Sequence, residues 1–192
     1  MALFPLETER LRLRGLELKD APKVRSYAGD WDVVRYLADV PYPYPEGLAE
    51  RWIRVTRDKL RQGDDYTLAI ARLADDALMG TVQMKIGDYA KGAEVGYWLG
   101  RPYWGQGYAT EALRRIVLLA FNRLGLHRVW GAALVDNRAS ERVLEKAGMR
   151  SLGIGEYNFP ARGGMRQVTY FALTREEAEQ DSSRLGAVVS RL

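Results

Sequence analysis

The chain has 192 residues, of which 47% are hydrophobic and 28% charged, as expected for one globular domain with a sizeable core. Its net charge of +4 comes from 29 basic and 25 acidic residues that are dispersed along the sequence, so nucleic acid is not the expected partner. The absence of cysteine excludes disulfides, thiolate metal sites and a cysteine acyl-enzyme.

The sequence shows no targeting, membrane or metal signal. Residues 1–14 lack the charged-then-apolar pattern of a signal peptide, and no apolar run reaches the length of a transmembrane helix. The only histidine, His127, has no metal-ligating partner near it in the sequence. We therefore expect a cytoplasmic protein without a membrane segment or a metal ion.

The first half of the chain is predicted to contain a strand, three helices and a hairpin. Leucines alternate with arginines around Leu13, which indicates a half-exposed strand. Asp20 is expected to cap the next helix, with Pro22 in its first turn. Ile53 and Val55 are expected to face inward from the third helix. The predicted helices span 20–28, 31–38 and 46–62, three prolines interrupt 41–45, and paired strands span 66–73 and 78–86.

The second half is predicted to form a crossover followed by a closing pair of strands. A short apolar run from Glu94 to Leu99 indicates a strand, and the helical spacing of apolar residues after Gly107 indicates a long amphipathic helix. This order favours a mixed α/β sheet in a single domain over 1–192. The later elements are a strand at 127–135, a helix at 138–147, strands at 150–159 and 166–174, and a helical tail at 175–192.

The turn between the central strand and its helix contains Gly105-Gln106-Gly107. A glycine-rich turn that opens a helix gathers free backbone N–H groups at the positive end of the helix dipole, which suits a phosphate. A tight connection with two conformational glycines is the alternative. Gln106 and Gly107 stand where a P-loop needs Lys and Ser or Thr, and the third glycine of the dinucleotide motif is missing, so ATP and NAD are disfavoured.

Residues 104–112, WGQGYATEA, resemble the acetyl-CoA pyrophosphate loop of the GNAT superfamily of N-acetyltransferases, in particular the branch of the ribosomal-protein acetyltransferases RimJ and RimL. The superfamily pattern is Gln/Arg-x-x-Gly-x-Gly/Ala; Gly107 and Ala109 fit it, whereas Trp104 occupies its first position, as is common in this branch. The resemblance covers residues 7–174. It implies a mostly antiparallel twisted sheet with a splayed central pair of parallel strands, flanked by helices.

The same resemblance implies where acetyl-CoA binds. The pantetheine would pair with the central strand, a backbone N–H near Tyr97 or Trp98 would donate to the acetyl carbonyl, and Gly96 would mark a bulge. The pyrophosphate would lie on the amides of the turn. The residues expected to bind acetyl-CoA are Tyr97, Trp98, Leu99, Trp104, Gly105, Gln106, Gly107, Tyr108, Ala109, Thr110, Asn137 and Ser140.

Asn137 and Ser140 open the second helix of the crossover region. On local grounds Asn137 is a helix cap and Ser140 a surface hydroxyl. The resemblance implies that Asn137 lies along the pantetheine and that Ser140 lies near the CoA sulfur. Many GNAT enzymes have a tyrosine acid where this chain has Leu144. Ser140 is therefore the expected group that protonates, or donates a hydrogen bond to, the leaving thiolate.

Glu94, at the start of the central strand, is the expected general base, because related enzymes often carry a carboxylate there. It would accept a proton from the acceptor amine through water. An exposed glutamate at a strand end, without a catalytic role, is an equal alternative. An α-amine has a pKa near ~8 and a lysine near ~10.4, so an α-amine needs less help from a base.

The acceptor site is expected to include Tyr42, Tyr44 and Glu94. Gln167 follows Arg166 where the branch frequently has an aspartate, so the resemblance leaves the acceptor open. The expected function is direct transfer of an acetyl group from acetyl-CoA to a primary amine, with a protein N-terminus favoured over a small molecule. A non-catalytic acyl-CoA-binding module is the alternative, and a homodimer formed through the C-terminal segment is a further hypothesis.

Overall fold

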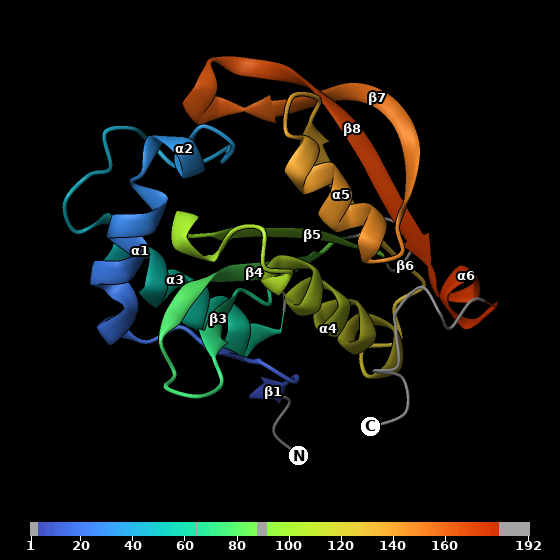
Figure 1. Cartoon of the computed structure of the whole chain (residues 1–192), viewed down its shortest axis with the longest axis horizontal. Helices are drawn as coiled ribbons and strands as arrows, with labels where there is room; N and C mark the ends of the chain where they lie inside the picture. Colours follow the sequence, from blue (N-terminus) through green and yellow to red (C-terminus); the bar gives the residue numbers. More distant parts are fainter. Residues whose placement is uncertain (1–3, 64, 88–91, 181–192) are drawn as a thin grey trace.

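The computed structural model describes residues 4–63, 65–87 and 92–180. Within these ranges one eight-stranded sheet has the order β1-β2-β3-β4-β5-β6-β8-β7, with helices on both faces (Figure 1). Only β5 and β6 run parallel. The predicted mixed, mostly antiparallel sheet is confirmed. The strands are β1 (Leu6–Glu7), β2 (Leu11–Gly15), β3 (Leu68–Arg72), β4 (Leu78–Ile86), β5 (Gly92–Leu99), β6 (Arg128–Leu134), β7 (Arg150–Phe159) and β8 (Gly164–Thr174).

The helices fall close to their predicted ranges, with one difference. The segment predicted as a helix over 31–38 contains only a single turn, α2. Short 3-10 turns precede α1, α4 and β8. The α-helices are α1 (Ala21–Ala28), α2 (Trp31–Val34), α3 (Leu48–Gln62), α4 (Tyr108–Asn122), α5 (Arg138–Lys146) and α6 (Arg175–Gln180); the 3-10 turns are η1 (Leu18–Asp20), η2 (Arg101–Tyr103) and η3 (Pro160–Arg162).

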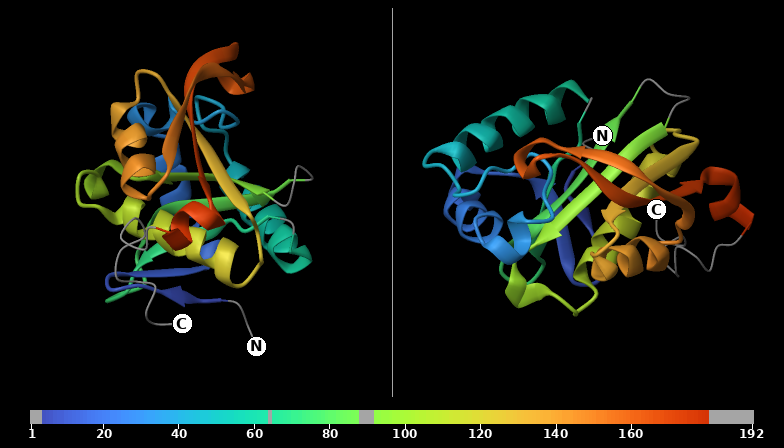
Figure 2. Two further views of the ribbon diagram at one scale, coloured as in Figure 1. Left: turned by 90° about the vertical axis from the view of Figure 1, so that its right-hand side faces the viewer. Right: turned by 90° about the horizontal axis from the view of Figure 1, so that it is seen from above.

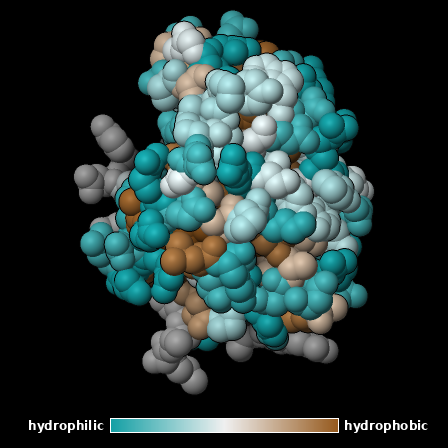
Figure 3. Space-filling model, turned by 90° about the vertical axis from the view of Figure 1, so that its left-hand side faces the viewer, coloured by the Kyte–Doolittle hydropathy of each residue, from teal (hydrophilic) through white to brown (hydrophobic). Residues whose placement is uncertain are grey.

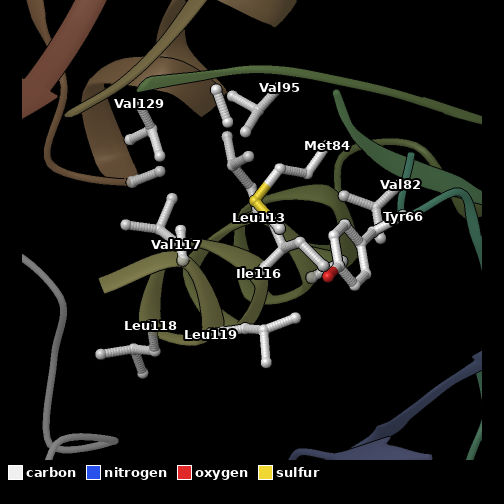
Figure 4. Packing of buried hydrophobic residues seen from close by; sticks show 14 of the residues in the cluster. Tyr66, Val82, Met84, Val95, Leu113, Ile116, Val117, Leu118, Leu119 and Val129 are labelled. Carbon is white, nitrogen blue, oxygen red and sulfur yellow. The ribbon is translucent and has the colours of Figure 1, made fainter. Parts of the chain in front are cut away.

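Helix α4 forms the main core with one face of the sheet. Leu113, Ile116 and Val117 follow the helical repeat and are fully buried. They belong to one cluster with Met84 of β4 and Val95 of β5, and Figure 4 shows Leu113 and Ile116 beside Met84. This packing fixes the axis of α4 against the centre of the sheet, and with it the position of the turn that precedes the helix.

Helices α1 and α3 cover the opposite face (Figure 2). Val24 of α1 and Ile53 of α3 are buried in a second cluster with Ala69 of β3, and Trp98 of β5 packs against it. Val55, expected to face inward, is 52% exposed; Thr56 is buried instead. On the side where α1 and α2 lie, hydrophobic residues reach the surface in small separate areas of a mostly hydrophilic face (Figure 3).

The parallel strands β5 and β6 separate after three residue pairs. The last pair is Glu94 with Trp130, so Val95 to Leu99 are paired with β4 alone among the described strands. A Cβ on Gly131 of β6 would lie 3.0 Å from the Val95 carbonyl oxygen and 3.2 Å from Leu144 of α5. Because pairing between the two parallel strands ends at Glu94 and Trp130, the predicted splay is confirmed. The bulge expected at Gly96 is wrong, because the register between β4 and β5 is continuous through it; the opening comes from the divergence of β6.

The hairpin of β7 and β8 extends beyond the sheet and is held at its turn by the segment that contains α2 (Figure 1). Arg162 Nη2 donates to the carbonyl oxygens of Val34 and Val40, each at 2.7 Å. The backbone N–H of Ala161 donates to the carbonyl of Ala38 at 2.9 Å. We refer to these contacts as the hairpin clamp. It joins two parts of the chain that are more than one hundred residues apart in sequence.

Asp20 occupies the N-cap position of α1, as predicted, but its side chain makes no capping hydrogen bond to that helix. Its side chain accepts from Arg14 at 2.8 and 3.0 Å and from the backbone N–H of Glu17 at 2.8 Å. Arg14 is expected to lie on the exposed face of its strand, but only 8% of it is exposed and it is therefore buried. The hydrogen bond to Asp20 raises the pKa of Arg14 despite burial. An ion pair in this position is satisfied only while both partners are present.

Replacing Asp20 with alanine is expected to lower the free energy of unfolding by about 3 kcal/mol, because it leaves the Arg14 charge buried with fewer partners. Urea denaturation measures this change. Lys19→Ala is the matched control, since Lys19 is 58% exposed in the same cluster and its loss is expected to cost less than about 1 kcal/mol. Equal effects of the two substitutions would contradict the assignment.

None of the helices within the described ranges is long and apolar enough to cross a membrane. In the same residues no three His, Asp or Glu side chains are grouped so as to hold a metal ion. The predicted helical tail begins as α6, but residues 181–192, which include most of the segment expected to mediate a homodimer, lie outside the described part of the chain.

Candidate active site

The turn from Gly105 to Gly107 has the backbone conformation that its glycines suggested. Gly105 and Gly107 adopt φ of +73° and +82°, a left-handed conformation that residues with a Cβ rarely adopt. Apart from its two chain neighbours, no residue lies within 4 Å of a Cβ built on Gly105. Gly107 is the N-cap of α4 and offers no side-chain cap, so the N–H groups of the first helical turn have no partner in the helix itself. This geometry suits an anion.

Side chains of the turn brace it from within. The amide of Gln106 donates through Nε2 to the carbonyl of Pro102 at 2.9 Å, and the indole of Trp104 donates through Nε1 to the carbonyl of Leu99 at 2.8 Å. The turn is thus fixed to the end of β5 on one side and to α4 on the other.

Arg10, which sequence reasoning did not single out, lies against the turn. Its Nη1 donates to the carbonyl of Gln106 at 3.0 Å, its Nη2 pairs with Glu111 at 2.6 Å, and its Cζ lies 4.5 Å from the centre of the Tyr108 ring. Thr8 also donates to Glu111, at 2.6 Å. An ion pair between Arg10 and Glu111 therefore ties the glycine turn and the start of α4 to the segment before β2. Because Arg10 is about one hundred residues away in sequence, no local motif could reveal it.

Asn137 caps α5 as predicted, since its Oδ1 accepts from the backbone N–H of Ser140 at 3.2 Å. Helix α5 is also tied to the sheet. Thr169 of β8 donates to Glu141 at 2.7 Å, and Arg138 pairs with the same carboxylate at 2.6 Å. The hydrogen bond from Thr169, together with Arg138, lowers the pKa of Glu141. These contacts fix Ser140 at the first turn of α5.

Tyr97 and Ser140 form a hydroxyl pair across the opening between β5 and β6. Their oxygen atoms Oη and Oγ lie 2.7 Å apart, and the Tyr97 hydroxyl also donates to the Ser140 carbonyl at 3.0 Å. Burial raises the pKa of Tyr97. The side chain of Tyr97 packs against the α4 core, whereas that of Trp98 packs on the α1 and α3 face, as the alternation of a strand requires.

Glu94 forms a second pair, with Tyr157 of β7. The Tyr157 hydroxyl donates to Glu94 Oε1 at 2.7 Å, and Glu94 is half-buried. Burial, followed by the bond to Glu94, raises the pKa of Tyr157, so this hydroxyl keeps its proton at neutral pH. The carboxylate retains a second oxygen for another donor. Glu94 and Tyr97 are three positions apart in β5, and their side chains consequently leave opposite faces of the strand.

The two tyrosines expected to line the acceptor site lie in different surroundings. Tyr44 packs against the cluster that also holds Trp98, and burial raises its pKa. Tyr42 is 51% exposed, and its ring centre lies 5.0 Å from that of Trp31. Tyr44 thus shares a cluster with the strand that carries Glu94, whereas Tyr42 forms an aromatic pair at the surface.

Comparison with known proteins identifies related sequences over most of the chain. A family model described as an acetyltransferase (GNAT) domain matches residues 10–150. The uncharacterized N-acetyltransferase p20 of Bacillus licheniformis is 31% identical over 173 residues, which are 90% of this chain and 97% of that protein. The matched region includes the glycine turn, β5 and the start of α5.

Solved structures share the fold over a similar extent. The ribosomal-protein-S5-alanine acetyltransferase of Vibrio fischeri aligns with a TM-score of 0.74 at 19% identity and covers 89% of this chain and 96% of its own. The spermidine N-acetyltransferase of Vibrio cholerae, solved with CoA and spermine, aligns with a TM-score of 0.73 at 19% identity, covering 88% and 98%. The arrangement of β5, β6, α4 and α5 therefore belongs to a fold that recurs among acetyltransferases.

Proposed function

We propose that this chain, which belongs to the GNAT acetyltransferase family, transfers an acetyl group from acetyl-CoA directly to a primary amine. The observation that carries the proposal is the pair of left-handed glycines at the start of α4, with open space beside Gly105. Its relatives are named N-acetyltransferases. The chain has no cysteine that could form an acyl-enzyme, so direct transfer is the simpler route.

The glycine turn fits the pyrophosphate of acetyl-CoA. Free N–H groups from Tyr108 to Thr110 and the dipole of the 15-residue helix α4 favour negative charge there. Arg10 braces the turn through its hydrogen bond to the Gln106 carbonyl and its ion pair with Glu111. From this turn, the part of β5 that has separated from β6 leads toward Ser140. Residues 95–99 have a strand partner on one side only among the described residues, which leaves their other edge for an extended chain such as pantetheine.

Ser140 and Glu94 have different roles in the reaction on the two faces of β5. In the proposed reaction the amine nitrogen bonds to the acetyl carbon, and the bond from that carbon to sulfur breaks, with the electron pair leaving on sulfur. The acceptor, initially an ammonium ion, loses one proton before attack and a second as the amide forms. Glu94 accepts these protons in turn through water and passes them to solvent. Ser140 donates a hydrogen bond to the departing sulfur, and the thiolate then takes one proton from solvent, so that one proton is released overall.

A protein N-terminal α-amine is the favoured acceptor. Residues 104–112 resemble those of ribosomal-protein acetyltransferases, and the Vibrio fischeri neighbour is named for a ribosomal-protein alanine. A polyamine is the second candidate, since the Vibrio cholerae neighbour is a spermidine N-acetyltransferase. An α-amine with a pKa near ~8 is about one-tenth neutral at pH 7, whereas a primary amine with a pKa near ~10.4 is almost fully charged.

A thiol-release assay tests the proposal and identifies the acceptor class. Acetyl-CoA is offered with N-terminal peptides, spermidine, amino acids and aminoglycosides, and mass spectrometry locates the added acetyl group. Turnover with peptides supports an N-terminal acceptor, and turnover with spermidine alone supports the second candidate. Acetyl-CoA binding without turnover on any amine would replace the proposal with a non-catalytic acyl-CoA-binding module, and failure to bind acetyl-CoA would overturn both.

Replacing Glu94 with glutamine is expected to lower the rate of transfer to an α-amine about tenfold at pH 7, because only the neutral fraction of the amine then reacts. The deficit should shrink as the pH rises above about 8, where the amine loses its proton without a base. Steady-state rates between pH 6 and 9 measure both effects. Glu156→Gln is the control, as Glu156 is an exposed carboxylate next to Tyr157. A deficit that does not change with pH would exclude Glu94 as the base.

A further inference from the structure

The pair formed by Tyr97 and Ser140 contains fewer hydrogens than acceptors. Two hydroxyl hydrogens face three oxygens: Tyr97 Oη, Ser140 Oγ and the Ser140 carbonyl. When Tyr97 donates to the carbonyl at 3.0 Å, the Ser140 hydrogen is free to donate to Tyr97 Oη at 2.7 Å. When Tyr97 donates to Ser140 Oγ instead, the Ser140 hydrogen must point elsewhere. The two arrangements differ only in hydroxyl rotation and need no movement of heavy atoms.

The surroundings hold this pair rigidly. Tyr97 packs against the main core beneath α5, and Ser140 is fixed by the cap at Asn137 and by the tie between Glu141 and Thr169. Burial raises the pKa of Tyr97, so its hydroxyl stays protonated and can donate a hydrogen bond throughout a reaction at neutral pH. A protonated, fixed donor at 2.7 Å occupies one of the three positions around the Ser140 oxygen, so the serine hydrogen takes one of the two that point away from Tyr97.

We propose that Tyr97 is a positioning residue for Ser140: by donating to Ser140 Oγ, it turns the serine hydrogen out of the pair and toward the sulfur of CoA. The inference rests on the proposed function, and it assigns to the Tyr97 side chain a role beyond the backbone contact expected of β5. In this arrangement Tyr97 transfers no proton. It strengthens the hydrogen bond that Ser140 donates, because a hydroxyl that accepts a bond becomes a better donor.

If the Tyr97 hydroxyl had only a structural role, its removal would give a different result. If the bond from Tyr97 to the Ser140 carbonyl only fastened α5 to β5, its loss would destabilise the fold without changing the environment of the sulfur. Tyr97→Phe keeps the ring that packs in the core and removes only the hydroxyl. The two explanations therefore separate when the state of the bound thiol, rather than protein stability or overall activity, is measured.

The first measurement is the pKa of the CoA thiol bound to the protein, followed by the ultraviolet absorbance of the thiolate. CoA itself is the probe, so no acceptor is needed. A hydrogen bond to the charged form lowers a pKa, and one such bond is expected to lower that of the bound thiol by about one unit relative to free CoA. Ser140→Ala should abolish the shift, and Tyr97→Phe should remove at least half of it. Tyr170→Phe, which removes a hydrogen-bonded hydroxyl from β8, should leave it unchanged.

The second measurement is a double-mutant cycle on turnover. Tyr97→Phe is expected to lower kcat about tenfold with less than twofold change in acetyl-CoA affinity. In the Ser140→Ala background the same substitution should have less than a twofold effect, because its target is already missing. Additive losses would mean that Tyr97 acts independently of Ser140 and would overturn the inference.

The outcomes separate this inference from the function on which it rests. A bound thiol that titrates like free CoA in the unmodified protein overturns the inference even if amines are acetylated. A shift that depends on Ser140 but not on Tyr97 overturns it as well, while the role of Ser140 stands. If no amine is acetylated but the shift depends on both residues, the proposed function fails and the positioning of Ser140 by Tyr97 is still supported. Failure to bind CoA would overturn both the proposed function and the positioning role of Tyr97.

Discussion

Replacing Gly107 with valine is expected to remove measurable acetyl-CoA binding, with the affinity falling at least about 100-fold. Gly107 has φ of +82°, where a β-branched residue is strongly disfavoured. The new side chain would either stand in the space where a phosphate approaches the amides or force the turn out of the left-handed conformation. A Cβ would also lie 3.5 Å from Arg10 Nη2, the atom that pairs with Glu111 at the start of α4.

Isothermal titration calorimetry with acetyl-CoA measures this loss, and Gly125→Val is the matched control. Gly125 also has a positive φ, +67°, but it follows the other end of α4, about 22 Å away for a 15-residue helix. It therefore carries the same backbone strain without touching the turn. If both variants lost affinity equally, the effect would be general destabilisation. Normal affinity in Gly107→Val would refute the assignment of the glycine turn to the pyrophosphate.

Replacing Ser140 with alanine is expected to lower turnover about 100-fold while acetyl-CoA affinity changes by less than about threefold. The Ser140 hydroxyl donates a hydrogen bond to the sulfur, whose negative charge develops only as the carbon–sulfur bond breaks. Its loss therefore affects the transition state more than the ground state. The helix should persist, because Asn137 caps it through the backbone N–H of residue 140, which alanine also has.

Rapid-quench measurement of a single turnover, alongside calorimetry, distinguishes the two parameters. Ser26→Ala is the control, since Ser26 is an exposed serine within α1 and its replacement should leave both parameters unchanged. If Ser140→Ala turned over at the normal rate, Ser140 would have no part in the mechanism. If it lost affinity and kept its turnover, the hydroxyl would contribute to binding alone.

Local patterns predicted most of the fold, because periodicity and glycine or proline positions act over a few residues. The apolar spacing of α4, the hairpin of β3 and β4, and the turn conformation of Gly105 are all of this kind. The predictions that the structure corrects concern residues whose surroundings depend on distant parts of the chain. Val55 is apolar but lies on the outer side of α3, and Asp20, at the N-cap position of α1, bonds Arg14 through its side chain instead of the helix. In each case tertiary packing overrides a local preference.

The candidate site divides in the same way. Gly107, Asn137 and Ser140 could be selected from short motifs, but the contacts that make them specific could not. Arg10 reaches the turn, Tyr97 reaches Ser140 and Tyr157 reaches Glu94 across sequence separations of 96, 43 and 63 residues. Each pair forms only because the fold brings together elements that are distant in the sequence. A glutamate and a tyrosine at such positions carry no signal in the sequence that they will meet.

The hairpin clamp limits how acceptor preference could be redesigned. The β7–β8 hairpin carries Tyr157, but its turn is fastened by Arg162 to the carbonyls of Val34 and Val40. A chimera that imports only this hairpin from a relative would keep the carbonyls of Val34 and Val40, but a hairpin without an arginine at position 162 would not bind them and its turn would be unattached. Residues 31–42 and 150–174 should therefore be exchanged together as a single cassette, although they stand far apart in the gene.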